Sequence, residues 1–109
     1  MEDLKNRTFV ITGAASGLGS CITKILLETG AFVVPTDCRF DRLQEACSRI
    51  EGSQERLKPM ELDVGDESQA QEVLEAAFEA FGSLDGVVNN AGIDKTVSIE
   101  ELSFAEWDR

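Results

Sequence analysis

The stretch TFVITGAASGLGSCI, residues 8–22, joins a short apolar run to three glycines and then to a segment of helical periodicity. Arg7–Thr12 is rich in β-forming residues and ends at a glycine, which predicts a buried strand. Residues 18–26 carry apolar side chains at helical spacing, and Gly30 follows as a stop signal. The stretch therefore predicts a strand that passes through a glycine turn into a helix.

The turn has the spacing Gly-x-x-x-Gly-x-Gly, formed by Gly13, Gly17 and Gly19. This spacing differs from the common dinucleotide fingerprint, Gly-x-Gly-x-x-Gly, and from a Walker A loop. The glycines alone indicate a structural corner as readily as a phosphate site. Between a strand and a helix, however, the helix N-terminus favours an anion. Gly13 would permit the tight turn, Gly17 would admit a diphosphate, and Gly19 would let the helix pack close to the strand.

Predicted strands and helices alternate along the rest of the chain. This alternation implies right-handed crossovers and a parallel sheet, and hence an α/β fold. The pair Asp66-x-x-Gln69 resembles a capping box, which predicts the start of a helix, and Gly82 predicts its end. Beyond the opening stretch, the predicted elements are a strand at 31–36, a helical stripe at 43–50, a strand at 57–64, a helix at 67–81 and a strand at 84–88.

Length and charge limit the class of protein and its partners. The chain has 109 residues, so we expect one domain spanning residues 1–109. Its 21 acidic and 10 basic residues give a net charge of −11, which argues against nucleic acid and anionic membranes as partners. No segment approaches the roughly 18 apolar residues of a membrane helix. The three cysteines have no metal-site spacing, which predicts free thiols, no metal and a cytoplasmic protein.

Asp37 lies 18 positions after Gly19, at the end of the second predicted strand. A carboxylate there accepts both hydroxyls of an adenosine ribose and repels a 2′-phosphate. The alternative is a solvated loop aspartate. Arg39 complicates the choice of cofactor, because it would either accompany a 2′-phosphate or lie over the adenine. On Asp37, the sequence favours NAD over NADP.

Four features together resemble the short-chain dehydrogenase/reductase family of NAD(P)-dependent oxidoreductases. They are Thr12–Gly19, Asp37, Leu62–Val64 and Asn89–Gly92, in the family's order and spacing. The resemblance covers the family's N-terminal, cofactor-binding half. It implies a Rossmann-like doubly wound parallel sheet, truncated to four strands in the order 3-2-1-4.

The resemblance also assigns cofactor contacts by position. It implies that the diphosphate lies along Ser16, Gly17, Leu18 and Gly19, and Gly13, at the tight turn, is counted with them among the cofactor-binding residues. It implies that the adenosine ribose meets Asp37 and Cys38, and that the adenine lies beside Asp63 and the backbone of Val64. It implies that Asn90, Ala91 and Gly92 border the ribose on the nicotinamide side, while Asn89 ties the sheet together. Taken alone, Asp63 is more typical of a loop that leads into a helix, and Asn89–Asn90 of a turn.

The residues that perform the family's chemistry are not found. Family members use a serine, a tyrosine and a Tyr-x-x-x-Lys lysine while hydride moves between the nicotinamide and an alcohol or carbonyl substrate. This chain has no tyrosine, and its lysines, at 5, 24, 58 and 95, fall outside that motif. We therefore assign no catalytic residue and expect the isolated chain to bind NAD but to be inactive. The alternative is a non-catalytic fragment that binds a dinucleotide or another subunit.

The resemblance has two consequences for the surface. Ser103–Arg109 matches the run into a helix that lies at a subunit interface in the family, which implies a homo-oligomer. In the complete family fold a fifth strand pairs with the strand at 84–88, so we expect an unpaired edge here. We also expect an uncovered apolar patch around Phe78 and Phe81.

Overall fold

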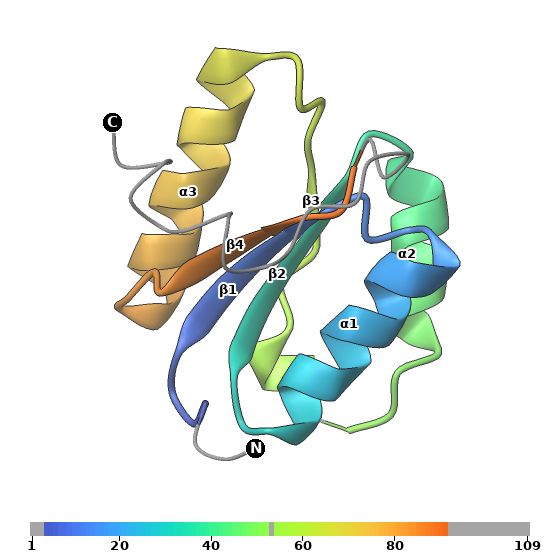
Figure 1. Cartoon of the computed structure of the whole chain (residues 1–109), viewed down its shortest axis with the longest axis vertical. Helices are drawn as coiled ribbons and strands as arrows, with labels where there is room; N and C mark the ends of the chain where they lie inside the picture. The colour runs from blue at the N-terminus through green and yellow to red at the C-terminus, as the bar shows by residue number, and fades with distance from the viewer. Residues whose placement is uncertain (1–3, 53, 92–109) are drawn as a thin grey trace.

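The computed structural model describes residues 4–52 and 54–91, in which helices and strands alternate along the chain (Figure 1). The strands of this part form a four-stranded parallel sheet in the order β3-β2-β1-β4, which confirms the expected fold class and strand order. The elements are β1 (Thr8–Thr12), α1 (Gly17–Glu28), β2 (Phe32–Asp37), α2 (Phe40–Ser48), the 3₁₀ turn η1 (Gln54–Arg56), β3 (Met60–Glu61), α3 (Glu67–Phe81) and β4 (Gly86–Asn89).

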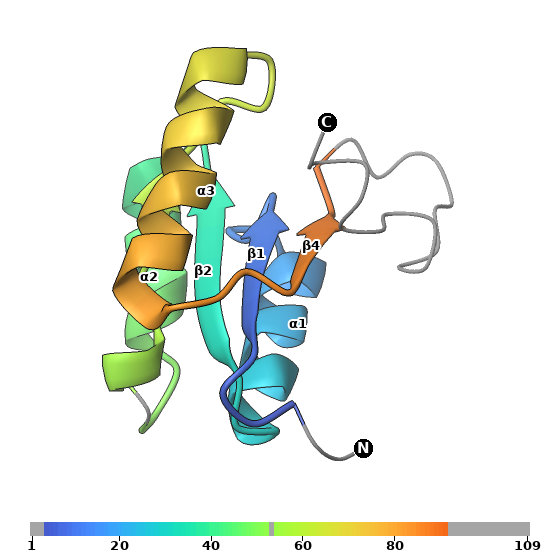
Figure 2. The same ribbon diagram turned by 90° about the vertical axis from the view of Figure 1, so that its left-hand side faces the viewer.

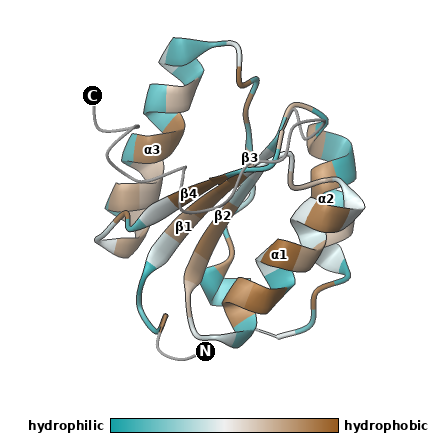
Figure 3. Ribbon diagram, in the orientation of Figure 1, coloured by the Kyte–Doolittle hydropathy of each residue, from teal (hydrophilic) through white to brown (hydrophobic). Residues whose placement is uncertain are grey.

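Helices lie on both faces of the sheet, with α1 and α2 on one side and α3 on the other (Figures 1 and 2). Neighbouring strand residues point to opposite faces, so Val10 and Ile11 of β1 enter separate cores. Ile11 packs with Leu27 of α1 and Leu43 of α2, whereas Val10 belongs to the core under α3. The central parts of β1, β2 and β4 are therefore apolar on both faces, and brown predominates along β2 and β4 in Figure 3.

β3 is much shorter than the expected strand at 57–64. The carbonyls of Val33 and Asp37 in β2 accept from backbone N–H groups on the β3 side, so Pro35, midway between them, also faces β3. Pro35 has no N–H to donate, so one hydrogen bond of the β2–β3 ladder is missing at the middle of β2. The pairing is therefore limited to an isolated bridge at Leu57 and the two residues of β3. The prediction of a strand over 57–64 was wrong in its length.

The end of α1 is closed by a side chain that the sequence pattern did not reveal. Arg56, in η1, donates from Nη1 to the carbonyl of Leu27 at 3.0 Å and to that of Ala31 at 2.9 Å. The last carbonyls of a helix lack intrahelical partners, and a guanidinium near them is favourable. η1 thus fastens the α2–β3 connection to the α1–β2 turn.

The surface of α3 differs in part from expectation. Phe78 is 55% exposed, as expected for an uncovered patch. Phe81 is half-buried, and its ring stacks on Phe32 of β2 with centroids 4.5 Å apart. The prediction that Phe81 belongs to an uncovered patch was therefore wrong. β4 pairs with β1, and within the described ranges no other strand adjoins it. No helix in these ranges has both the length and the apolar character needed to cross a bilayer.

Candidate functional site

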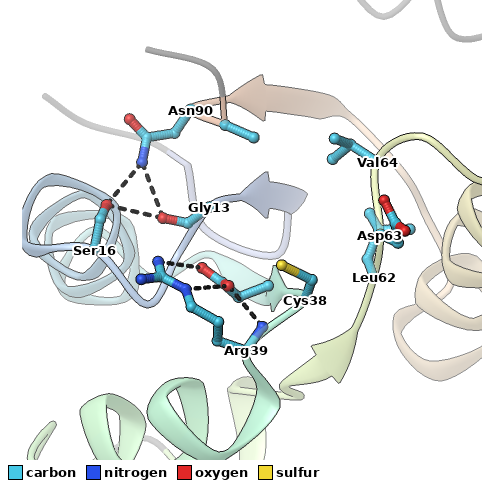
Figure 4. A pocket seen from close by; sticks show the side chains of 10 residues that line it. Gly13, Ser16, Cys38, Arg39, Leu62, Asp63, Val64 and Asn90 are labelled. Carbon is cyan, nitrogen blue, oxygen red and sulfur yellow. Dashed lines mark hydrogen bonds and ion pairs between the residues drawn. The ribbon is translucent and has the colours of Figure 1, made fainter. Parts of the chain in front are cut away.

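A pocket of about 390 Å³ opens where the carboxyl ends of β1, β2 and β4 meet (Figure 4). Parallel strands that end at one edge bring together loops far apart in the sequence, and ligands of open α/β sheets bind at such edges. In Figure 4 the glycine turn lies opposite the segment that follows β3, with Arg39 and Cys38 below and Asn90 above. The lining residues are Gly13, Ser16, Asp37, Cys38, Arg39, Leu62, Asp63, Val64, Asn90 and Ala91.

The three glycines of the turn have different surroundings. Gly13 has a φ of +64°, a conformation that favours glycine. A Cβ on Gly19 would lie 2.4 Å from the carbonyl oxygen of Gly13 and 2.6 Å from the Cα of Ala14, so only glycine fits there. A Cβ on Gly17 would meet nothing within 4 Å. The helix start is therefore packed tightly against the turn at Gly19 and is open to solvent at Gly17.

Ser16 caps α1 and holds the turn in shape. Its Oγ accepts from the backbone N–H of Gly19 at 3.0 Å and donates to the carbonyl of Gly13 at 2.9 Å. An N-cap side chain satisfies one of the orphan donors of the first helical turn and leaves others without intrahelical partners. Such a helix start carries partial positive charge, which suits an anionic group.

Asn90 joins the end of β4 to the glycine turn, across 77 positions of sequence. Its side chain is buried, and its Nδ2 donates to the carbonyl of Gly13 at 3.0 Å and to Ser16 Oγ at 3.1 Å. Both donor hydrogens of this amide are thus used inside the protein. Asn90 therefore shapes the pocket wall and holds the turn, and its amide nitrogen has no donor left for a ligand.

Thr12 makes a parallel connection one residue before the turn. Its hydroxyl donates to Asn89 Oδ1 at 2.9 Å and accepts from the backbone N–H of Ala91 at 3.0 Å. The end of β1 and the segment after β4 are thus held together on both sides of Asn90. This arrangement fixes the position of Ala91 against Gly13.

Asp37 ends β2 with both carboxylate oxygens occupied. Oδ1 accepts from the backbone N–H of Arg39 at 2.9 Å and from its Nε at 3.1 Å. Oδ2 accepts from the backbone N–H of Ala15 at 3.0 Å and from Arg39 Nη2 at 3.4 Å. The residue is only 4% exposed, whereas the Arg39 side chain is 48% exposed. The guanidinium thus lies between the carboxylate and solvent.

These contacts decide the charge of Asp37. Burial of the carboxyl group raises its pKa, but the hydrogen bonds from the side chain and backbone of Arg39 and from the backbone of Ala15 outweigh burial. The net result is a pKa below the ordinary value of 3.8, so Asp37 is ionised at neutral pH. In turn, the hydrogen bond from Arg39 to Asp37 raises the pKa of the guanidinium.

The opposite wall of the pocket follows β3. Leu62 is buried in the core under α3, whereas Asp63 and Val64 are exposed. Asp63 Oδ1 accepts from the backbone N–H of Gly65 at 3.0 Å, and the backbone N–H of Asp63 donates to Gln69 Oε1. Half of the expected capping box is confirmed, because Asp66 accepts from the backbone N–H of Gln69 at 3.1 Å. The Gln69 side chain instead reaches Asp63, so α3 positions this wall.

The family model for short chain dehydrogenases matches residues 7–109 of this sequence.

The chain belongs to the short-chain dehydrogenase/reductase family.

Relatives and solved structures agree with this assignment. The 3-oxoacyl-[acyl-carrier-protein] reductase of Thermotoga maritima is 33% identical over 105 residues, which cover 96% of this chain and 43% of the reductase. A short-chain dehydrogenase/reductase from Brucella melitensis superposes with a TM-score of 0.78 at 34% identity, covering 100% of this chain and 46% of that one. The C-domain of bacterial malonyl-CoA reductase, solved with NADP, gives a TM-score of 0.76 at 25% identity, covering 85% of this chain and 16% of that one.

This short-chain dehydrogenase/reductase chain spans less than half the length of the Thermotoga and Brucella proteins. Most of the residues expected at its cofactor site do converge on the pocket. Three of the expected residues do not line it: Gly17 and Leu18 are exposed on the first turn of α1, and Gly19 is buried behind the turn. Gly92 lies outside the described residues. The expected residues that line the pocket are Gly13, Ser16, Asp37, Cys38, Asp63, Val64, Asn90 and Ala91.

Three features of the pocket were missed from the sequence. The ion pair between Arg39 and Asp37 has a visible signal in their spacing of two residues. The contact of Gln69 with Asp63 has a weaker signal, since a glutamine at this helix position normally turns back to the cap. The role of Thr12 has no signal in the sequence, because its hydrogen-bond partners lie 77 and 79 positions away.

The three cysteines are free thiols, as expected. Cys38 is exposed at the pocket, whereas Cys47 is buried between α2 and the sheet. Burial raises the pKa of the Cys47 thiol from 9.0 to about 11, so this residue behaves as a small apolar side chain. Residues 4–52 and 54–91 contain no group of three histidine, cysteine or acidic side chains arranged to hold a metal.

Proposed function

We propose that this chain is the cofactor-binding half of an NAD(P)-dependent oxidoreductase and that its pocket holds NAD. The observation that carries the proposal is the meeting of an open helix start and an ionised carboxylate at one sheet edge. Gly17 leaves space above the first turn of α1, and Asp37 ends the neighbouring strand. A dinucleotide has an anionic centre and ribose hydroxyls, which match these two groups.

The pocket walls suggest how the cofactor would lie. The diphosphate would run along Gly13, Ser16 and Gly17, and the adenosine ribose would meet Asp37 beside Cys38. The adenine would lie against Asp63 and Val64, on the wall that Gln69 holds. Ala91, with Gly92, would border the nicotinamide ribose; Leu18 and Gly19 would complete the first turn. Asn90 would act by shaping this wall, because its donors are used by Gly13 and Ser16.

NAD is favoured over NADP by the charge at the end of β2. Asp37 is ionised at neutral pH, and an ionised carboxylate repels a 2′-phosphate. Arg39, which would otherwise attract that phosphate, already pairs with Asp37 at 3.1 Å. The charge available to a 2′-phosphate at this position is therefore reduced.

When bound, the nicotinamide would supply hydride transfer to or from an alcohol or carbonyl substrate. The 109 residues include no tyrosine and no histidine that could exchange the accompanying proton. We therefore propose that the chain binds the cofactor but has no turnover by itself, and that residues 1–109 act as a single cofactor-binding domain. The free thiols favour a reducing, cytoplasmic setting, and the family resemblance favours a homo-oligomer.

A charge placed at Gly17 tests the site without disturbing the fold. Gly17→Asp adds a carboxylate where a Cβ has nothing within 4 Å, so the variant should remain folded. It should lose the NAD-dependent rise in melting temperature and the heat of NAD binding, because the carboxylate meets the diphosphate. The matched control is Gln44→Glu, which adds the same charge at an exposed position of α2 and should bind NAD normally.

NAD binding that survives Gly17→Asp unchanged would overturn the proposed position of the diphosphate. Failure of the unaltered chain to bind NAD in calorimetry would overturn the proposed function itself.

A further inference from the structure

The Asp37 carboxylate has no acceptor position left for a ligand. A carboxylate offers about four lone-pair sites, two on each oxygen. Arg39 fills both sites of Oδ1, with its backbone N–H at 2.9 Å and its Nε at 3.1 Å. The backbone N–H of Ala15 at 3.0 Å and Arg39 Nη2 at 3.4 Å fill the sites of Oδ2. A ribose that approaches this carboxylate meets a saturated acceptor.

The four donors are of two kinds. The N–H groups of Ala15 and Arg39 belong to the backbone at the glycine turn and at the start of α2, so they are held in place. The guanidinium lies at the end of a long side chain with several rotatable bonds, and this side chain is 48% exposed. Each carboxylate oxygen therefore carries one fixed donor and one donor that can leave. Departure of the guanidinium would open one acceptor site on each oxygen.

Two acceptor sites on one carboxylate match two neighbouring hydroxyl groups. We propose that the Arg39 guanidinium is a built-in competitor that occupies the sites needed by the adenosine ribose diol and swings aside when the ribose binds. The inference rests on the proposed function, because it concerns the same nucleotide site. It assigns Arg39 a role opposite to that of a ligand-binding cation, since removing the side chain strengthens the binding of a ribose.

The Arg39 side chain is the member of the ion pair that is free to be displaced, because it is half exposed. Within the described part of the chain, the hydrogen bonds of the Arg39 side chain all go to Asp37, and it makes no side-chain cap to α2. Because the guanidinium end of this ion pair is half exposed, solvent competes for its hydrogen bonds and weakens the pair. A diol that donates two hydrogen bonds to an ionised carboxylate can compensate for that loss.

A 2′-phosphate should respond to Arg39 in the opposite direction. A 2′-phosphate takes the place of one of the two ribose hydroxyls, so only one donor is left for Asp37, and the phosphate lies against the same negative charge. It gains from the cationic guanidinium, with which it can form a bidentate pair. Removing the side chain should therefore strengthen binding of a diol and weaken binding of a 2′-phosphate.

The test compares Arg39→Ala with the unaltered chain by NMR titration of three probes. Adenosine carries the diol, 2′,3′-dideoxyadenosine lacks it, and adenosine 2′-monophosphate carries the phosphate. We expect adenosine to bind Arg39→Ala roughly three- to tenfold more tightly, dideoxyadenosine to be unchanged and the 2′-phosphate to bind more weakly. Arg42→Ala is the matched control, since it removes the same charge from an exposed position and should leave all three affinities unchanged.

Equal gains for adenosine and dideoxyadenosine, or weaker adenosine binding in Arg39→Ala, would overturn the competition while leaving the nucleotide site intact. Absence of adenosine and NAD binding to either protein would overturn the proposed function and this inference together.

A second measurement needs no variant. The Arg39 Nε–H resonance of the unaltered chain should move when adenosine saturates the site, because its bond to Asp37 is lost. Dideoxyadenosine should leave this resonance in place. An unmoved Arg39 resonance at saturating adenosine would contradict displacement.

Discussion

Gly19 lies against the backbone of the turn that precedes it, whereas Gly17, two residues earlier, borders open space. The two glycines therefore serve different purposes, although they belong to the same motif. Gly19 allows α1 to approach Gly13 and Ala14 closely, which fixes the angle at which the helix leaves the sheet. Gly17 has no such packing duty, so a requirement for glycine there would come from a ligand.

Alanine at each position should separate packing from binding. Gly19→Ala places a Cβ 2.4 Å from a backbone oxygen and should lower the free energy of unfolding by at least about 2 kcal/mol. Gly17→Ala meets no atom and has no positive φ to lose, so the change should lie between zero and a gain of about 1 kcal/mol. Urea denaturation measures both. Equal losses for the two variants would mean that the turn does not pack as described.

α3 presents two phenylalanines three residues apart in different environments. Phe81 stacks on Phe32 of β2 and packs against the core under the helix. Phe78 is 55% exposed, on a side of the helix that the described residues leave open. The element is thus held to the sheet by one aromatic ring and presents the other to solvent.

Replacing each of these rings by alanine should lower the free energy of unfolding by clearly different amounts. Phe81→Ala should lower the free energy of unfolding by about 2–3 kcal/mol, since it removes a partly buried ring and its stacking on Phe32. Phe78→Ala should change it by no more than about 0.5 kcal/mol, as for other exposed positions. The two values come from the same denaturation experiment. A loss at Phe78 as large as that at Phe81 would indicate that something covers Phe78 in solution.

The molecule as a whole carries a net charge of −11, yet one of its carboxylates is buried at the pocket. Because hydrogen bonds from Arg39 and Ala15 overcome burial, the pKa of Asp37 in the folded chain lies below 3.8. A group with a lowered folded-state pKa stabilises the fold above its unfolded pKa. That stabilisation is lost as the pH falls from 3.8 through the lower folded value.

Asp37→Asn should reveal this contribution in the pH dependence of stability. At neutral pH the variant should be less stable by about 1–3 kcal/mol, because charge-assisted hydrogen bonds at a buried position are weakened. The difference from the unaltered chain should shrink as the pH falls below 3.8 and the native carboxyl becomes protonated. Urea denaturation between pH 7 and strongly acidic pH measures it. If the stability difference between the two proteins grew on acidification, the pKa of Asp37 would not be lowered by folding.

Much of this architecture could be predicted because local rules govern it. The helix at 67–81 begins after Asp66 and ends at Gly82, as its cap and its left-handed glycine dictate. The β3 prediction failed because the pattern along one strand says nothing of its neighbour, and Pro35 in the neighbouring strand β2 has no N–H to give to their ladder. Strand order followed from the family resemblance rather than from any single segment.

The sequence by itself determined the glycine turn, the alternation of strands and helices, and the acidic residue at the end of β2, since each depends on residues close together in the chain. Only the tertiary structure decided what those residues do. Asn90 reaches the turn from 77 positions away, and Asp37 accepts from Ala15 across 22 positions. Hydrogen bonds have few donors and acceptors to share, so which partners meet in space determines which groups remain for a ligand.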